Sequence, residues 1–214
     1  MSITVHHLEN SRSQRVLWLL EELGLPYEIK RYERNKKTLL APPELGKVHP
    51  LGKSPVIEDV DMTGEHIVMA ETGAIVEYLV QKAGGGLGPP ASRQDQLRYQ
   101  HFLHYAEGSL MPVLFVKLVL GRIPLMGGMA VKRFQPMVST HITYVESELA
   151  GRPWFAGAGF CAADIMMIFP LEAARSRAGI TRQTYPHIFA WLNTIHARPA
   201  YQRALAKGGP YAYV

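Results

Sequence analysis

The chain has 214 residues, of which 47 % are hydrophobic and 19 % charged, and it carries a single cysteine. This composition is typical of a globular protein with a substantial core. No uninterrupted apolar run approaches the roughly 20 residues that a membrane-spanning helix needs, and the N-terminal sequence lacks a secretory pattern, so no membrane association is expected. One cysteine excludes an intramolecular disulfide and a CxxC redox pair, which favours a cytoplasmic location.

The net charge of +5 is unevenly distributed along the chain. Residues 1–81 carry 9 basic and 12 acidic side chains, whereas residues 82–214 carry 14 basic and 6 acidic ones. The basic residues are scattered, and no nucleic-acid-binding signature accompanies them, so we interpret them as solvated helix faces. No nucleic-acid partner is expected.

The first third of the chain alternates between strand and helix patterns. Residues 3–8 form an apolar stretch typical of a buried strand, and apolar side chains then recur at helical spacing over residues 16–23. Gly24 follows, where helices favour a left-handed C-terminal residue, and Pro26 prevents the helix from continuing. Residues 27–29 resemble a second strand, so this β-α-β order predicts a parallel pair with a right-handed crossover.

Two further strands and a helix complete this region. Residues 54–59 predict a short strand opened by proline, residues 61–65 a turn, and residues 67–69 the hairpin partner of that strand. A helix is expected from Glu71 onward. The resulting order, β-α-β-β-β-α, is that of a thioredoxin-like domain, which we predict over residues 1–82.

The composition changes at residues 83–91, where glycine and proline accumulate in the way typical of a domain linker. Beyond this linker every periodic segment is helical, so residues 92–214 predict an all-helical C-terminal domain. The fold class is therefore α/β plus all-α. The expected helical segments cover residues 93–120, with a bend at Pro112, and residues 129–149, 162–178 and 186–206.

The sequence resembles the cytosolic glutathione S-transferases. The resemblance rests on the first turn and helix (residues 10–24), on His49-Pro50-Leu51-Gly52-Lys53-Ser54-Pro55-Val56 and on Ala70-Glu71-Thr72-Gly73-Ala74-Ile75, and it extends to Ala163-Asp164-Ile165 and Tyr185-Pro186-His187-Ile188. Residues 41–45, Ala-Pro-Pro-Glu-Leu, are similar to those of a fungal and proteobacterial group of the serine type. These motifs cover nearly the whole chain in the family's order.

The resemblance implies glutathione as co-substrate and attack by its thiolate on a hydrophobic electrophile. A free thiol has a pKa of about 8.5, so hydrogen-bond donors and a helix N-terminus must stabilise the charged form. The turn before the first helix offers Ser11, the first candidate for the catalytic donor. Asn10 and Ser13 remain alternatives, because an asparagine amide donates as a hydroxyl does and related classes place the donor at different positions.

Five further residues match the family's glutathione-binding positions. Ser54 and Pro55 occupy the position of a cis-proline, where the backbone of Ser54 would pair with the cysteinyl backbone of glutathione. Lys53 would reach the glycine carboxylate, while Glu71 and Thr72 would hold the γ-glutamyl end. Threonine stands where relatives usually have serine, which preserves the hydroxyl.

The helical domain is expected to contribute the electrophile pocket, with Tyr105 as a candidate substrate-binding residue. The family further implies a homodimer, detoxification as a role, and no metal. His101 and His104 lie three residues apart but lack a companion ligand at metal spacing. A glutathione-dependent isomerase or peroxidase, and a non-catalytic ligand-binding or regulatory protein on the same fold, are the alternative functions.

Cys161-Ala162-Ala163-Asp164 replaces the Ser/Thr-x-x-Asp capping box expected at this position of the family. Because a thiol is a poor acceptor, half of the reciprocal arrangement is expected to be weak, and Cys161 is expected to be a buried structural thiol.

Overall fold

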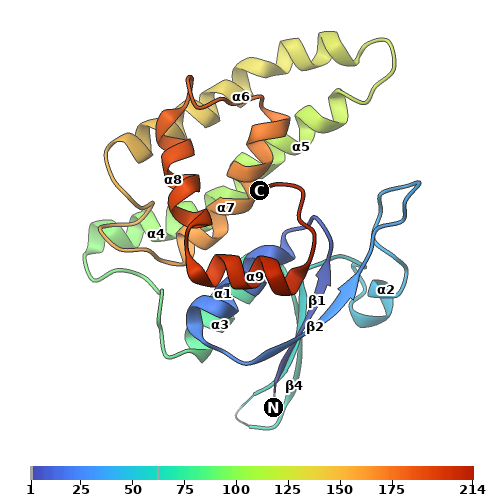
Figure 1. The fold of residues 1–214 in the computed structure, drawn as a ribbon, viewed down its shortest axis with the longest axis vertical. Helices are drawn as coiled ribbons and strands as arrows, with labels where there is room; N and C mark the ends of the chain where they lie inside the picture. Colours follow the sequence, from blue (N-terminus) through green and yellow to red (C-terminus); the bar gives the residue numbers. More distant parts are fainter. Residues whose placement is uncertain (1, 62) are drawn as a thin grey trace. The chain divides into compact units, whose positions relative to one another are not determined.

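The computed structural model describes residues 2–61 and 63–214 and divides into two compact units (Figure 1). The first unit comprises the chain up to Gly88 together with Ala197–Ala212 and Val214, and the second comprises Pro89–His196 and Tyr213. The sequence had assigned all of residues 92–214 to the helical domain. The contacts instead group residues 197–212 with the first unit, because the last helix packs against the first one.

The first unit is built on a four-stranded sheet of order β2-β1-β3-β4. Its strands are β1 (Ile3–Leu8), β2 (Tyr27–Tyr32), β3 (Val56–Val60) and β4 (His66–Ala70). β1 and β2 run parallel, while β1 with β3 and β3 with β4 run antiparallel, which confirms the predicted β-α-β unit and the hairpin. Met62, in the predicted hairpin turn, and Met1, at the start of the predicted first domain, lie outside the described residues.

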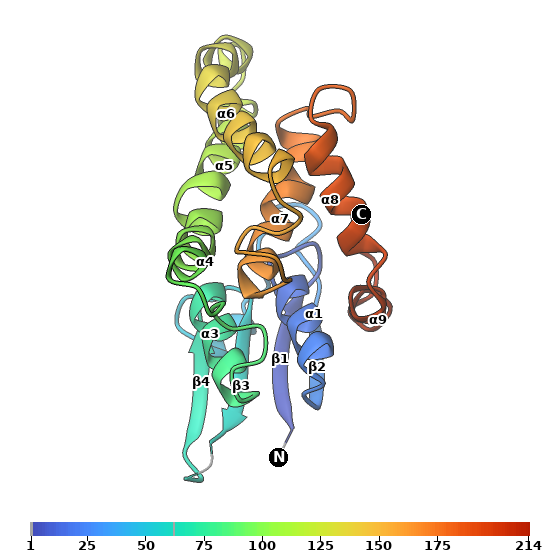
Figure 2. The same ribbon diagram turned by 90° about the vertical axis from the view of Figure 1, so that its left-hand side faces the viewer.

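Four helices accompany the sheet: α1 (Ser13–Leu23), the short α2 (Leu45–Val48), α3 (Thr72–Lys82) and α9 (Pro199–Gly208). α1 contacts β1 and α3, and α3 contacts β4, so the two helices lie along the sheet (Figure 2). α1 ends at Gly24 with φ 66°, the left-handed C-terminal residue that the sequence predicts. The thioredoxin-like order is therefore confirmed.

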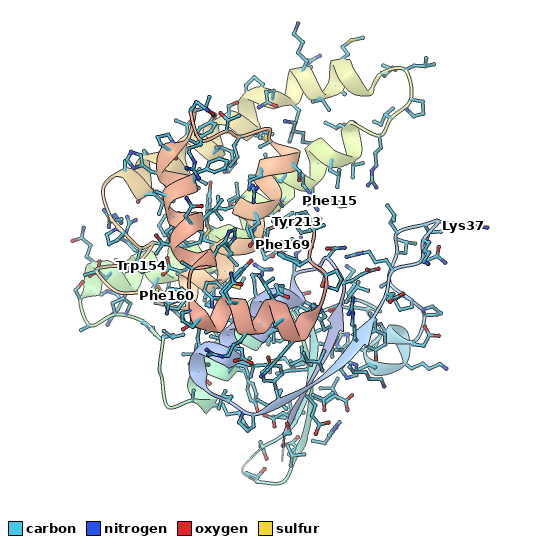
Figure 3. All side chains as sticks on the ribbon, viewed as in Figure 1. Lys37, Phe115, Trp154, Phe160, Phe169 and Tyr213 are labelled. Carbon is cyan, nitrogen blue, oxygen red and sulfur yellow. The ribbon has the colours of Figure 1, made fainter. Side chains whose placement is uncertain are left out.

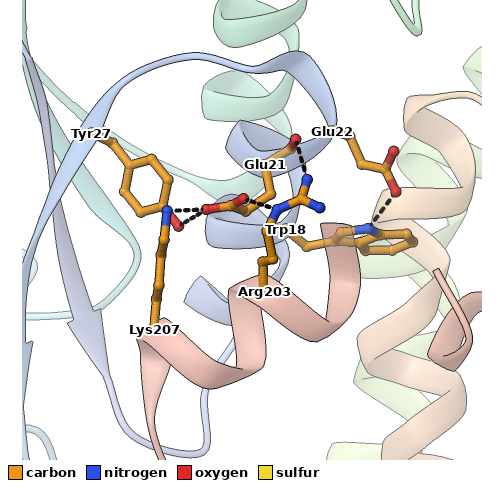
Figure 4. A network of polar contacts seen from close by, with 6 residues as sticks. All are labelled: Trp18, Glu21, Glu22, Tyr27, Arg203 and Lys207. Atoms are coloured by element: carbon orange, nitrogen blue, oxygen red, sulfur yellow. Dashed lines mark hydrogen bonds and ion pairs between the residues drawn. The ribbon is translucent and has the colours of Figure 1, made fainter. Parts of the chain in front are cut away.

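α9 is anchored to the end of α1 by two glutamates. Arg203 Nε donates to Glu21 at 2.7 Å, and Arg198 Nε donates to Glu22 at 2.6 Å. The Lys207 ammonium also donates to Glu21. Burial alone would raise the pKa of Glu21, but the hydrogen bonds from Lys207, Arg203 and Tyr27 lower it to about 2. Figure 4 also shows Trp18 Nε1 donating to Glu22 and Tyr27 donating to Glu21. Glu21 therefore stays charged throughout the physiological pH range.

The second unit is entirely helical. It contains α4 (Arg93–Tyr105), a π-helix η1 (Ala106–Leu110), α5 (Met111–Leu120), α6 (Gly127–Ala150), α7 (Ala162–Arg177) and α8 (Pro186–His196). α7 is buried on all sides from its first residue to Ala174 and contacts α4, α5, η1 and α8. A helix that is buried on every side belongs to a core, so α7 is the centre of this unit.

Two of the predicted helical segments are interrupted in the structure. In residues 93–120 the irregularity is η1, one turn before Pro112, which lies in the first turn of α5. A wider turn at this point accommodates a proline that lacks an N–H and crowds the preceding turn. The single segment predicted over residues 186–206 is wrong: Arg198 is extended, with ψ 130°, and Pro199 begins a separate helix.

The helical run Arg93–Leu120 passes a simple test for membrane-spanning helices. Its most apolar 18-residue window has a mean hydropathy of 1.3, and 39 % of that window is buried in the structure. Length and composition alone would thus allow it to cross a bilayer, although the sequence contains no uninterrupted apolar run of that length. Core helices of globular proteins have the same properties, so this run assigns no membrane location.

α7 begins with a capping box in which both partners are in place, with the Cys161 thiol standing where the family usually has a hydroxyl. Asp164 Oδ2 accepts from the Cys161 N–H at 3.0 Å, and the Cys161 side chain accepts from the Asp164 N–H. The thiol also lies 3.5 Å from Asp164 Oδ2, and Asp164 Oδ1 accepts from the Phe155 N–H at 3.1 Å. Burial, followed by the Asp164 carboxylate, raises the pKa of Cys161 to about 12, so the thiol is inert, as the sequence predicts.

Replacing Cys161 by serine is expected to stabilise the protein by about 0.5–1 kcal/mol, because a hydroxyl is a stronger N-cap acceptor than a thiol. Cys161→Ala, which removes the cap acceptor, is the matched control and is expected to be destabilising. Urea unfolding of the three proteins measures the difference. A serine variant no more stable than the alanine variant would contradict the contribution of the cap.

Candidate functional site

The predicted binding residues gather at one end of the sheet. His6 of β1 pairs with Val56 of β3, and Val56 pairs in turn with Ala70 of β4, both in antiparallel register. The residues that follow β1, precede β3 and follow β4 therefore lie at the same edge. This edge carries the turn Glu9–Ser13, the Lys53-Ser54-Pro55 segment and Glu71-Thr72.

The Ser54-Pro55 peptide bond is cis, as the sequence predicts. The Ser54 hydroxyl continues the pairing of β3 with β1: it donates to the His6 carbonyl at 2.7 Å and accepts from the Leu8 N–H at 3.2 Å. Because the side chain takes over this role, the backbone of Ser54 makes no hydrogen bond with the other described residues. It is left to pair with an extended peptide in the manner of an added strand.

Glu71 and Thr72 form the N-terminus of α3. Glu71 is exposed and holds a left-handed backbone, with φ 70°, a conformation that costs a non-glycine residue about 1–3 kcal/mol and is concentrated at functional sites. The Thr72 hydroxyl is buried and accepts from Arg15 Nη2 at 3.5 Å, so its own proton is left to donate. Lys53 is exposed at the same edge. A carboxylate at the α3 N-terminus would meet free N–H groups and the positive end of the helix dipole.

The turn after β1 is held in place from both sides. Asn10 has φ 49°, which asparagine tolerates better than most residues, and its Oδ1 accepts from the Ala212 N–H at 2.7 Å. The Arg34 guanidinium donates to the Glu9 carbonyl at 3.2 Å and to the Asn10 carbonyl at 3.3 Å. Because the amide oxygen of Asn10 is engaged, its NH₂ group is the part presented as a donor.

Ser11 and Ser13 belong to a buried chain of hydrogen bonds that leads away from the turn. The two hydroxyls lie 2.7 Å apart, and Ser13 Oγ lies 2.8 Å from His7 Nδ1 and 3.3 Å from the Leu8 carbonyl. Ser11 Oγ also accepts from the Ser13 N–H at 3.2 Å. Ser13 is fully buried, so its hydroxyl contacts only the protein.

The protonation state of His7 determines which groups donate and which accept along this series of hydrogen bonds. Burial, and then the Arg31 guanidinium, lower the pKa of His7 to about 4, so the imidazole is neutral at pH 7. The Gly208 backbone, which lies beside the imidazole, opposes this shift, and this favours the tautomer with the ring proton on the nitrogen that faces Gly208. Nδ1 is then an acceptor and takes the Ser13 proton, so Ser13 accepts from Ser11. The Ser11 proton thus points into the protein.

Tyr105 lies in the helical unit. Its hydroxyl is 2.7 Å from His141 Nδ1 of α6, its ring stacks on His101, and its side chain is largely buried. Burial raises the pKa of the Tyr105 phenol above its ordinary value, so the hydroxyl is protonated at pH 7. Its predicted contact with an electrophile stays a prediction.

Within residues 2–61 and 63–214, no group of three or more His, Cys, Asp or Glu side chains is arranged to hold an ion. His6 instead bonds Tyr32 and Glu58, at 2.8 and 2.6 Å.

Three residues that position the turn were not singled out from the sequence: His7, Arg34 and Ala212. His7 carried a signal, because two adjacent histidines in a fully buried strand each need a hydrogen-bond partner. Arg34 and Ala212 carried none, since the Arg34 side chain donates to backbone carbonyls and Ala212 donates through its backbone N–H, and only the fold brings these groups together.

A thioredoxin-like unit with a cis-proline edge, a donor-bearing turn after β1 and a helical second unit is the architecture of a glutathione S-transferase. The sequence profile described as "Glutathione S-transferase, N-terminal domain" matches residues 11–82, and "Glutathione S-transferase, C-terminal domain" matches residues 130–199. The chain belongs to the glutathione S-transferase family.

Similar proteins share most of their length with this chain. Glutathione S-transferase 3 of Schizosaccharomyces pombe is 36 % identical, with 96 % of this chain and 87 % of the relative covered. Glutathione S-transferase 1 of Saccharomyces cerevisiae is also 36 % identical, with 96 % and 94 % covered. The solved structure of a glutathione S-transferase from Actinobacillus pleuropneumoniae has a TM-score of 0.85 at 34 % identity, with 96 % and 92 % covered.

Proposed function

We propose that this protein is a glutathione transferase that conjugates the thiolate of glutathione to hydrophobic electrophiles. The observation that carries the proposal is the edge of the sheet, where a free Ser54 backbone, the N-terminus of α3 and a donor-bearing turn converge. These groups match the three parts of glutathione: the cysteinyl backbone, the γ-glutamyl carboxylate and the thiol. The relatives named as transferases support the same activity.

The thiolate donor that the geometry favours is the Asn10 amide. Ser13 is enclosed, and the Ser11 proton is directed toward Ser13, so neither hydroxyl is poised to donate outward. Asn10 is partly exposed on the turn, its oxygen is occupied by Ala212, and its NH₂ remains to donate. A hydrogen bond to a charged group contributes about 1.5–3 kcal/mol, equivalent to a thiol pKa lowered by about 1–2 units.

Each remaining binding residue has one role in this proposal. Glu71 accepts from the γ-glutamyl ammonium, and Thr72 with the first N–H groups of α3 donates to the adjacent carboxylate. Arg15, buried at 1 % exposure behind Thr72, adds positive potential on the same side. Lys53 reaches the glycine carboxylate.

Conjugation of glutathione to 1-chloro-2,4-dinitrobenzene, followed by the absorbance of the product, tests this function. The expected result is a saturable, glutathione-dependent rate that S-methylglutathione inhibits competitively, since that analogue keeps every binding group except the thiol. Competitive binding without turnover of any electrophile or peroxide would indicate a non-catalytic ligand-binding protein instead. Turnover of a hydroperoxide alone would indicate a peroxidase.

A further inference from the structure

The C-terminal segment, residues 208–212, meets the candidate site at two points. The Ala212 N–H donates to Asn10 Oδ1 at 2.7 Å, and the Gly208 backbone lies beside the His7 imidazole and opposes the lowering of its pKa. Both contacts are made by backbone groups, so they depend on the path of the segment rather than on its side chains. They act on His7 and on Asn10, the two residues whose hydrogen bonds determine which donors the turn presents.

Two glycines shape the path of the segment. A Cβ on Gly208 would lie 2.9 Å from Gln14 Oε1 and 3.0 Å from Leu17 Cδ1, so a larger residue there would displace these two side chains of α1. Gly209 has φ +85°, a conformation that L side chains rarely adopt, and a Cβ there would overlap the Arg31 guanidinium. The chain therefore leaves α9 in a direction that only glycine permits, and this direction leads to Asn10.

Both contacts favour the Asn10 NH₂ group, rather than a serine hydroxyl, as the donor that the turn presents outward. Gly208 fixes the His7 tautomer, which draws the Ser13 proton, and with it the Ser11 proton, into the protein. Ala212 fixes the amide of Asn10 with its oxygen inward and its NH₂ outward. Without the Ala212 N–H, the amide would be free to rotate and present its oxygen, which would repel a thiolate.

We propose that the C-terminal segment Gly208–Ala212 is a positioning element of the thiolate site, through which the Ala212 backbone N–H directs the Asn10 amide toward the glutathione sulfur. The inference rests on the proposed function, because it concerns the thiolate that the proposed reaction uses. α9 supplies the rigidity: it is held to α1 by the ion pairs of Glu21 and Glu22 with Arg198, Arg203 and Lys207, all of which precede the segment.

Substitution of Ala212 by proline removes the donor, since proline has no N–H, at an exposed position where folding does not depend on the side chain. In the Ala212→Pro complex with glutathione, the thiol pKa, read from thiolate absorbance, is expected to rise by about 1 unit, the equivalent of one lost hydrogen bond. At pH 6.5 kcat is expected to fall about 10-fold while KM for glutathione stays within about twofold. Ala212→Ser keeps the N–H and is expected to retain the lowered thiol pKa.

A second variant does not depend on the conformation of proline. A chain that ends at Tyr211 lacks the Ala212 donor and is expected to behave as Ala212→Pro does. Its control is Tyr213→Ala, which removes the ring that packs on Phe169 with centroids 5.4 Å apart but leaves Ala212 in place (Figure 3). This control is expected to keep the wild-type thiol pKa.

The outcomes separate the two proposals. If glutathione bound to the wild type has a lowered thiol pKa and both donor-lacking variants keep it, the positioning role is overturned while the proposed function stands. If glutathione binds the wild type with an unshifted thiol pKa, the proposed function fails, and the positioning role fails with it. A shift lost equally in Tyr213→Ala would also overturn the specific role of the Ala212 N–H.

Discussion

Replacing Asn10 by alanine is expected to raise the pKa of the bound glutathione thiol by about 1–2 units, because the variant lacks the donor that stabilises the thiolate. Below the thiol pKa the conjugation rate follows the thiolate fraction, so kcat/KM at pH 6.5 is expected to fall about 10–100-fold. The loss is expected to diminish as the pH rises through the new pKa. A pH profile of kcat/KM measures both effects.

Two further substitutions isolate the amide from the rest of the side chain. Asn10→Asp keeps an oxygen for the Ala212 N–H but replaces the NH₂ with a second, negatively charged oxygen, so the thiol pKa is expected to exceed that of the alanine variant. Asn10→Ser restores a donor and is expected to recover part of the activity. Ser11→Ala is expected to change the thiol pKa little. If Ser11→Ala raised it while Asn10→Ala did not, the hydroxyl would be the donor.

Replacing Asp164 by alanine is expected to lower the free energy of unfolding by about 3 kcal/mol at pH 5. The variant leaves the N–H groups of Phe155 and Cys161 without an acceptor in a buried site, and each unsatisfied group costs about 1–3 kcal/mol. Asp164→Asn, which has the same size and keeps one acceptor oxygen, is expected to lose less. Urea unfolding of the three proteins provides the comparison.

The loss caused by Asp164→Ala also depends on pH. Burial raises the pKa of Asp164 to about 6 in spite of the opposing hydrogen bonds, whereas an unfolded carboxyl titrates near 3.8. The folded protein therefore holds the proton more tightly, and the contribution of Asp164 to stability falls as the pH rises from about 4 to 6. The difference in unfolding free energy between wild type and Asp164→Ala is expected to be smaller at pH 7 than at pH 5. A difference that grew over this range would contradict a raised pKa.

The strand and helix order of the first unit could be predicted because its signals are local. Gly24 and Pro26 end α1 where the periodicity stops, and the strand before them pairs in parallel because a helix must connect the two. The cis bond before Pro55 was predicted from the resemblance and is confirmed. These features could be predicted because each depends on residues that are close together in the sequence.

The errors arose where a local pattern had two interpretations. Apolar periodicity continues across Arg198, so one helix was predicted where two exist, although Pro199 marks the start of the second. Pro112 indicated a bend, but the sequence could not place the irregularity in the preceding turn, because a π-helix has no composition of its own.

The sequence could predict which residues lie at the candidate site, but not which of them donates to the thiolate. The motif placed Asn10, Ser11 and Ser13 on one turn, but only the fold shows that His7 draws the hydroxyl protons inward. Ala212 contacts Asn10 across 202 positions of sequence, through a backbone group that any residue but proline supplies. Such a contact leaves no residue-specific signal in the sequence. The homodimer, the cytoplasmic location and the electrophile stay predictions.

The ultraviolet absorbance of the thiolate, recorded while the wild-type protein saturated with glutathione is titrated with base, tests the proposed function most directly. The expected result is a bound thiol whose pKa lies about 1–2 units below the value near 8.5 of an ordinary thiol. Glutathione that binds with an unshifted thiol pKa, or that does not bind at all, would contradict the assignment of a thiolate-stabilising site to this edge of the sheet.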